Sequence, residues 1–103
     1  FSATLEEVAY ADLILHVIDL TDKNLDIHKE VVLNELKNIN AYNIPSLTVY
    51  NKMDVLTTEE KIRLRNSDII EKDAIFISAK QNENIEKIKD AILNKLFENK
   101  INY

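Results

Sequence analysis

Two short polar motifs contain the residues whose types and spacing are best suited to chemistry. The motifs are Asn51-Lys52-Met53-Asp54, of the form N-K-x-D, and Ser78-Ala79-Lys80. An ionised carboxylate such as Asp54 can accept hydrogen bonds from two adjacent N–H groups, and bonds to ionised acceptors are the stronger kind. The first motif therefore predicts a site that reads a ligand edge carrying two neighbouring donors.

Guanine is the purine whose edge fits such a carboxylate. It presents its N1–H and its exocyclic amine side by side, whereas adenine cannot supply that pair. An unmatched base leaves a desolvated carboxylate without donors, so the wrong purine is rejected strongly. The alternative for residues 51–54 is a strand-to-helix turn in which Asn51 and Asp54 only satisfy backbone donors.

Three apolar runs predict the buried strands that position these motifs. They cover residues 13–18, 46–50 and 74–77. Helical patterns alternate with them over residues 2–10, 24–40, 58–65 and 85–98. This order predicts right-handed crossovers and a parallel sheet covered on both faces. Ligands bind beyond the carboxyl ends of strands in such sheets, so the two motifs should lie side by side.

Polar residues at the starts of the helices predict how the connecting turns close. Thr21 or Asp22 should cap the helix over 24–40, and Thr57 with Glu60 has the spacing of a capping box. Asp19 ends the first strand, where we expect it to cap the following turn, with a polar role at the rim of the sheet as the alternative.

Composition narrows the function classes. The chain has 103 residues, a net charge of −5 and no cysteine. The acidic balance argues against general affinity for nucleic acid or anionic membranes, and no apolar run is long enough to span a bilayer. Zero cysteines fit a reducing compartment, so we expect a cytoplasmic protein.

The chain contains no glycine at all. Phosphate-binding loops need glycine so that backbone N–H groups can turn towards the phosphate oxygens. The sequence therefore cannot contain G-x-x-x-x-G-K-[ST] or G-x-G-x-x-G, and phosphate chemistry would need residues outside it.

The two polar motifs resemble the guanine-recognition motifs of P-loop GTPases. The resemblance implies that Asp54 binds the base edge, that Asn51 braces the loop and that Lys52 lays its stem along the base. It further implies that the Ala79 N–H donates to the guanine carbonyl oxygen, that Ser78 shapes the turn and that Lys80 flanks the base. Lys80 also fits an ordinary surface lysine.

Within that superfamily, residues 1–8 and 11–19 are similar to the HflX family of ribosome-associated GTPases. The resemblance implies that residues 1–103 are the carboxyl-terminal part of a GTP-binding domain without its phosphate loop and switch regions. We expect an incomplete P-loop GTPase fold, a Rossmann-like three-layer α/β unit with three parallel strands and flanking helices. The intact parent would bind GTP or GDP with Mg²⁺, hydrolyse GTP and contact the large ribosomal subunit.

The fragment alone should contain no catalytic residue and no metal site, hold no nucleotide tightly and be inactive. Alternatives are a fragment of an Era-like or Obg-like translation GTPase, or a non-catalytic ribosome-interaction module. We also expect self-association through the exposed edge of the strand over 13–19. Where related chains tend to place glycines after the second motif, Asn82 and Asn84 should preserve the turn, because asparagine tolerates positive φ.

Overall fold

A computed structural model of the chain describes residues 10–101, with side chains up to residue 97. The helix expected over residues 2–10 lies almost wholly outside the described residues. The described elements are β1 (Ile14–Asp19), α2 (Leu25–Asn38), β2 (Ser46–Asn51), the 3₁₀ helix η1 (Met53–Val55), α3 (Thr58–Arg65), β3 (Ile75–Phe76) and α4 (Ile85–Ile101). The predicted α/β class with three strands is confirmed.

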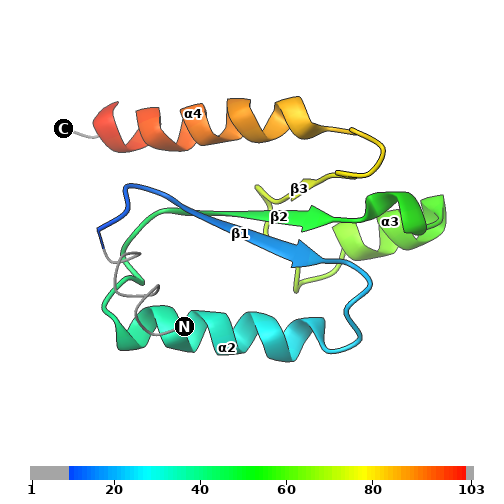
Figure 1. The fold of residues 1–103 in the computed structure, drawn as a ribbon, viewed down its shortest axis with the longest axis horizontal. Helices are drawn as coiled ribbons and strands as arrows, with labels where there is room; N and C mark the ends of the chain where they lie inside the picture. Colours follow the sequence, from blue (N-terminus) through cyan, green and yellow to red (C-terminus); the bar gives the residue numbers. More distant parts are fainter. Residues whose placement is uncertain (1–9, 102–103) are drawn as a thin grey trace.

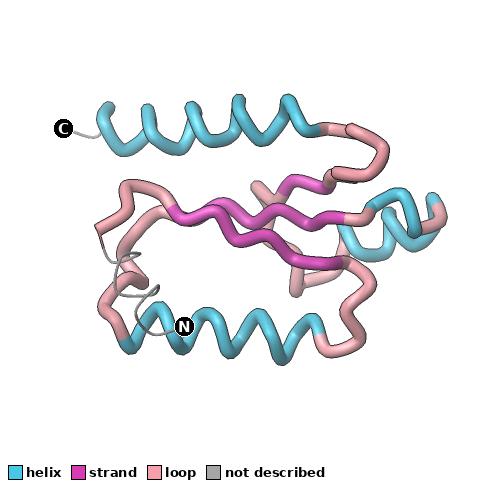
Figure 2. Tube along the Cα trace, viewed as in Figure 1, coloured by secondary structure: helices cyan, strands magenta, loops and turns pink. Residues whose placement is uncertain are grey.

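The sheet is parallel throughout, with the strands in the order β1-β2-β3. β1 pairs with β2 from Ile14 opposite Ser46 to Asp19 opposite Asn51. The helices α2 and α4 lie on opposite faces of the sheet, and α3 lies beyond the carboxyl ends of the strands (Figure 1). The loops that follow the three strands leave the sheet at the same end, as Figure 2 shows.

Apolar residues of the strands form a separate core on each face of the sheet. One core joins Ile18, Tyr50 and Phe76, with Leu25 of α2 packed against it. The other core joins Leu47, Val49 and Ile77 with the apolar stripe of α4. Alternate residues of β2 thus point to opposite faces, and a continuous apolar run is what a strand covered on both sides requires.

The third strand is shorter than the predicted 74–77. Only Ile75 and Phe76 pair with β2 in regular register. The Ile77 N–H still donates to the Tyr50 carbonyl at 2.8 Å, but Ser78 turns away and pairs with Glu83 through two backbone hydrogen bonds. The second motif therefore begins directly at the point where the chain leaves the sheet.

Of the two predicted helix caps, the one for α3 is confirmed and the one for α2 is wrong. Helix α3 begins with the expected capping box, in which Thr57 and Glu60 bond each other's backbone N–H. The prediction of Thr21 or Asp22 as the cap of α2 is wrong, because its N-cap is Asn24, whose side chain makes no capping bond. The Thr21 hydroxyl instead donates to Asp19, and Asp22 Oδ1 accepts from the Asn24 N–H. Both polar side chains are thus used within the turn.

Candidate functional site

The structure brings the two motifs together at the carboxyl edge of the sheet. Asn51 is the last residue of β2, and Asp54 lies in η1 immediately beyond it. The Met53 N–H donates to the Ile77 carbonyl at 2.9 Å, which ties the first motif to the end of the neighbouring strand. The side-by-side arrangement predicted from the strand order is therefore present.

Asn51 braces both motifs through one side-chain oxygen. Its Oδ1 accepts from the backbone N–H of Lys52 at 2.8 Å and from that of Ala79 at 3.0 Å. Lys52 has φ 72° and ψ 32°, a left-handed conformation that non-glycine residues adopt only when their surroundings hold them there. The Asn51 side chain therefore stabilises the strained turn and joins it to the second motif.

Ser78 fixes the carboxylate of Asp54. Ser78 is fully buried, and its hydroxyl donates to Asp54 Oδ1 at 2.7 Å while accepting from the Gln81 N–H at 3.1 Å. A carboxylate offers about four acceptor positions, and Ser78 uses one of them. The half-buried Asp54 therefore retains capacity for two further N–H donors.

The Ala79 N–H is engaged within the chain, since it donates to Asn51. Its binding to a guanine carbonyl oxygen stays a prediction, and it requires that the N–H be shared with Asn51 or released by it. Lys80 is exposed, and both of its interpretations, flanking the base or serving as a surface lysine, stay open.

Asn82 and Asn84 close the loop behind the second motif. Both have positive φ, 55° and 62°, so the prediction that asparagine would adopt this conformation in the turn is confirmed. The Asn84 Nδ2 also donates to the Phe76 carbonyl at 2.9 Å, a bond that glycine could not make. The sequence predicted the backbone conformation but gave no sign of this side-chain bond.

Asp19 performs both of the roles considered for it. Its Oδ1 accepts from the Thr21 N–H at 2.8 Å and the Thr21 hydroxyl at 2.6 Å, which closes the turn after β1. Its Oδ2 accepts from Lys52 Nζ at 2.8 Å. The hydrogen bond from Lys52, followed by those from Thr21, lowers the pKa of Asp19 to about 2, so the carboxylate is ionised at neutral pH.

A polar network that sequence reasoning missed supports β2 on the α2 face. Glu71 accepts hydrogen bonds from Lys29, Thr48 and Tyr50, and Lys29 also donates to the Tyr50 hydroxyl. Burial raises the pKa of Glu71, but hydrogen bonds from Tyr50, Thr48 and Lys29 together outweigh it and bring the pKa to about 2. The network joins residues up to 42 positions apart, so no local pattern could reveal it.

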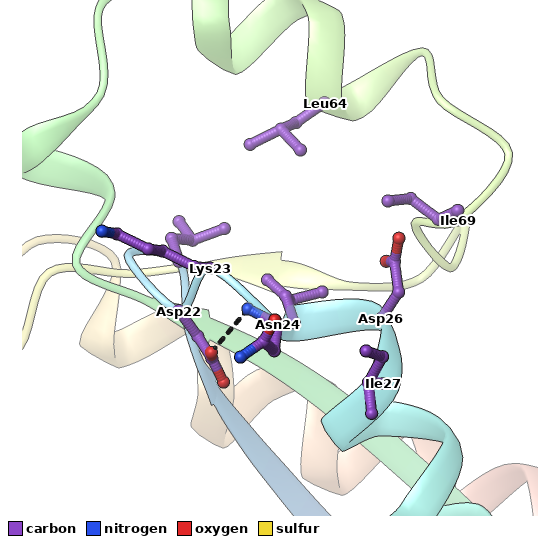
Figure 3. A pocket seen from close by; sticks show the side chains of 9 residues that line it. Asp22, Lys23, Asn24, Asp26, Ile27, Leu64 and Ile69 are labelled. Carbon is purple, nitrogen blue, oxygen red and sulfur yellow. Dashed lines mark hydrogen bonds between the residues drawn. The ribbon is translucent and has the colours of Figure 1, made fainter.

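A separate hollow of about 330 Å³ lies between the turn after β1, the start of α2 and the end of α3. Figure 3 shows Asp22 and Asn24 on one side of it, and Leu64 and Ile69 on the other. None of the residues that line it belongs to either motif, so the hollow is distinct from the candidate site.

The described residues contain neither a metal-binding group nor a membrane span. Within residues 10–101, no group of three or more His, Asp or Glu side chains could hold a metal ion. Across the same part of the chain, every helix is too short or too polar to cross a bilayer.

Comparison with known proteins identifies the class of protein to which this fold and site correspond. The family model described as "C-terminal region of MMR_HSR1 domain" matches residues 6–97. The chain therefore belongs to that family.

Three curated relatives of this chain share one name. The chain is 39% identical to "GTPase HflX" of Caldanaerobacter subterraneus over 97 residues, covering 94% of this chain and 21% of that protein. It is 37% identical to "GTPase HflX" of Methanocaldococcus jannaschii over 99 residues, covering 93% of this chain and 24% of that protein. It is 34% identical to "GTPase HflX" of Escherichia coli over 96 residues, covering 93% of this chain and 22% of that protein. The resemblance to the HflX family is thus confirmed, and the chain spans between a fifth and a quarter of the length of these relatives.

Proposed function

We propose that this chain is the base-recognising carboxyl-terminal part of a GTP-binding domain, within a protein that hydrolyses GTP. The proposal rests on one observation above all, the bonding of the two motifs to each other at the edge of the sheet. Asn51 holds Ala79, and Ser78 holds Asp54, so the groups matched to guanine form one unit. The similarity to proteins named GTPase HflX supports the same function.

Base recognition follows from the donor and acceptor groups of this unit. Asp54 accepts the N1–H and the amine of guanine, and the Ala79 N–H donates to the guanine carbonyl oxygen. The stem of Lys52 covers the base plane, with Lys80 beside it. A base with the adenine edge leaves the Asp54 carboxylate without donors, which is costly for a half-buried charge.

Phosphate binding and hydrolysis belong to the intact protein in this proposal. This chain lacks the glycines of a phosphate loop. GTP hydrolysis would depend on Mg²⁺, held by residues outside this chain, and on electrostatic stabilisation of the transferred phosphoryl group. The intact protein would act in the cytoplasm at the large ribosomal subunit, and this fragment alone would be inactive.

The test compares nucleotide binding by the intact protein and two variants. Asp54→Asn should abolish the preference for GDP over ADP, because an amide cannot accept both guanine donors as a carboxylate does. Asp68→Asn makes the same chemical change at an exposed position of the α3–β3 loop and should leave the preference intact. An unchanged preference in Asp54→Asn would refute base reading. If ribosome binding were lost at the same time, the interaction-module alternative would be favoured.

Calorimetry of the isolated chain tests whether phosphate recognition depends on residues outside it. The chain should bind GDP weakly or undetectably, because most of the charge on the nucleotide finds no partner in it. Sub-micromolar, Mg²⁺-dependent binding would contradict the assignment of phosphate recognition to residues elsewhere.

The isolated chain should also self-associate through β1. Leu15 is 42% exposed and Val17 55% exposed on this strand, whose outer edge pairs with no other strand among the described residues. Unpaired strand edges and exposed apolar side chains favour strand addition. Light scattering should detect a dimer or larger species; a monomer with unprotected amides at residues 13–18 in hydrogen exchange would count against it.

A further inference from the structure

An ion pair links the strand ends on which the candidate guanine site stands. Lys52 Nζ donates to Asp19 Oδ2 at 2.8 Å, from the residue after β2 to the last residue of β1. Asp19 lies opposite Asn51 in the strand register, and the Leu20 N–H donates to the Asn51 carbonyl at 3.0 Å. The paired backbones therefore set the separation between the two charged groups.

Both ends of the Lys52 side chain are fixed. At the backbone, the left-handed conformation and the bond from its N–H to Asn51 set the direction of Cβ. At the tip, Asp19 holds the ammonium group, and two bonds from Thr21 orient the Asp19 carboxylate independently of Lys52. The flexible stem between these points is thus stretched across the rim of the sheet from β2 towards β1.

The ion pair contributes little to folding stability. The Lys52 side chain is 50% exposed and that of Asp19 is 44% exposed, and ion pairs with such access to water stabilise proteins weakly. The pair does restrict a long side chain that would otherwise sample many rotamers. Ordering such a side chain in advance reduces the entropy lost when a ligand binds against it.

We infer that Asp19 is a positioning residue of the guanine site, which acts by holding Lys52 so that its alkyl stem forms a ready platform for the base. This inference rests on the proposed function. Asp19 itself touches no base; its effect on nucleotide affinity passes through the Lys52 ammonium group.

The test uses Asp19→Asn in the intact protein, with GDP as the probe. Asparagine keeps an oxygen that can accept from Thr21, so the turn is preserved while the charge on Lys52 loses its partner. GDP affinity should fall about threefold to tenfold, the range expected for ordering one long side chain. The matched control is Asp22→Asn, which lies in the same turn and pairs with His28; it should leave affinity within twofold.

A double-mutant cycle separates positioning from a general structural effect. Lys52→Met keeps the length of the stem but removes the ammonium group. In that background Asp19→Asn should cause no further loss of GDP affinity, whereas structural damage would cause the same loss in both backgrounds. Asp19→Glu keeps the charge and should recover part of the affinity. The inference would be overturned if the losses of GDP affinity caused by Asp19→Asn and Lys52→Met simply added in the double variant. It would also be overturned if Asp19→Asn had no effect on GDP affinity.

Two further measurements keep the result decisive. If Asp19→Asn melts below the assay temperature, Asp19→Ser, whose hydroxyl can also accept from Thr21, replaces it with the same expected outcome. Asp54→Asn is measured in parallel: if it leaves guanine preference unchanged, the proposed function fails. If Asp54→Asn loses the preference while Asp19→Asn binds GDP normally, only the role of Asp19 fails.

Discussion

Ser78 offers a quantitative test of how the site is built. Its hydroxyl donates to the Asp54 carboxylate at 2.7 Å and accepts from the Gln81 N–H at 3.1 Å, in a fully buried position. A hydrogen bond to a charged group contributes about 1.5 to 3 kcal/mol. The bond from the Gln81 N–H to the hydroxyl is only partly buried and Gln81 is exposed, so we expect water to replace the hydroxyl as the acceptor of this N–H. Ser78→Ala should therefore lower the free energy of unfolding by about 2 kcal/mol, mainly through Asp54.

The matched control is Ser67→Ala, which also removes one hydroxyl. Ser67 donates to the Leu64 carbonyl at 2.9 Å near the end of α3, a half-buried bond between neutral groups. Its loss should cost about 0.5 to 1 kcal/mol. Urea unfolding of the chain at one matched protein concentration, extrapolated linearly to water, measures both values. A cost for Ser78→Ala equal to or below that for Ser67→Ala would refute the account of the Asp54 bond.

The same pair of variants tests function in the intact protein. Without the Ser78 hydroxyl, the Asp54 carboxylate is no longer held in one orientation, so GDP should dissociate faster than from the unmodified protein. Ser67→Ala should leave the dissociation rate unchanged. A faster rate in both variants would indicate general loosening of the fold rather than loss of an oriented carboxylate.

Two other predictions concern the surroundings of the site. The pKa of Glu71 is about 2 in the folded chain, against an ordinary value of 4.5. The ionised carboxylate therefore stabilises the fold fully above pH 4.5, and this stabilisation is lost as the pH falls towards 2. Glu71→Gln should lower the free energy of unfolding by about 1 to 2 kcal/mol at pH 7. The gap in unfolding free energy between the variant and the unmodified chain should shrink below about pH 4. A gap that stays constant as the pH is lowered would contradict this prediction. In the closing loop, Asn84→Gly should cost about 1 kcal/mol because it removes the bond to Phe76, whereas Asn82→Gly should change stability by less than about 0.5 kcal/mol. Equal effects in urea unfolding would show that the Asn84 bond contributes nothing.

The arrangement of the elements could be predicted because it follows from local patterns. Apolar runs ending at Asp19, Asn51 and Ser78 indicate strands whose carboxyl ends share an edge. That edge places the two motifs together, as the backbone bond from Met53 to Ile77 demonstrates. Periodicity and strand order therefore sufficed to predict which motifs would meet.

The side-chain contacts between distant residues could not be predicted in the same way. Lys29 and Glu71 are 42 positions apart, and each resembles an ordinary surface charge in the sequence. The third strand was overestimated because apolar character continues through Ile77, while its regular pairing ends at Phe76. Which of several nearby polar residues closes a turn depends on three-dimensional geometry, which is why Asn24 was missed as the N-cap of α2.

The most direct test of base reading exchanges the chemistry of the ligand together with that of Asp54. Xanthine carries a carbonyl oxygen where guanine carries its amine, so an asparagine amide can donate to it where a carboxylate can only repel it. In the intact protein, Asp54→Asn should lose affinity for GDP and gain affinity for xanthosine diphosphate, reversing the order of preference. If the variant still prefers GDP over xanthosine diphosphate by the original ratio, Asp54 does not read the base and the central claim is wrong.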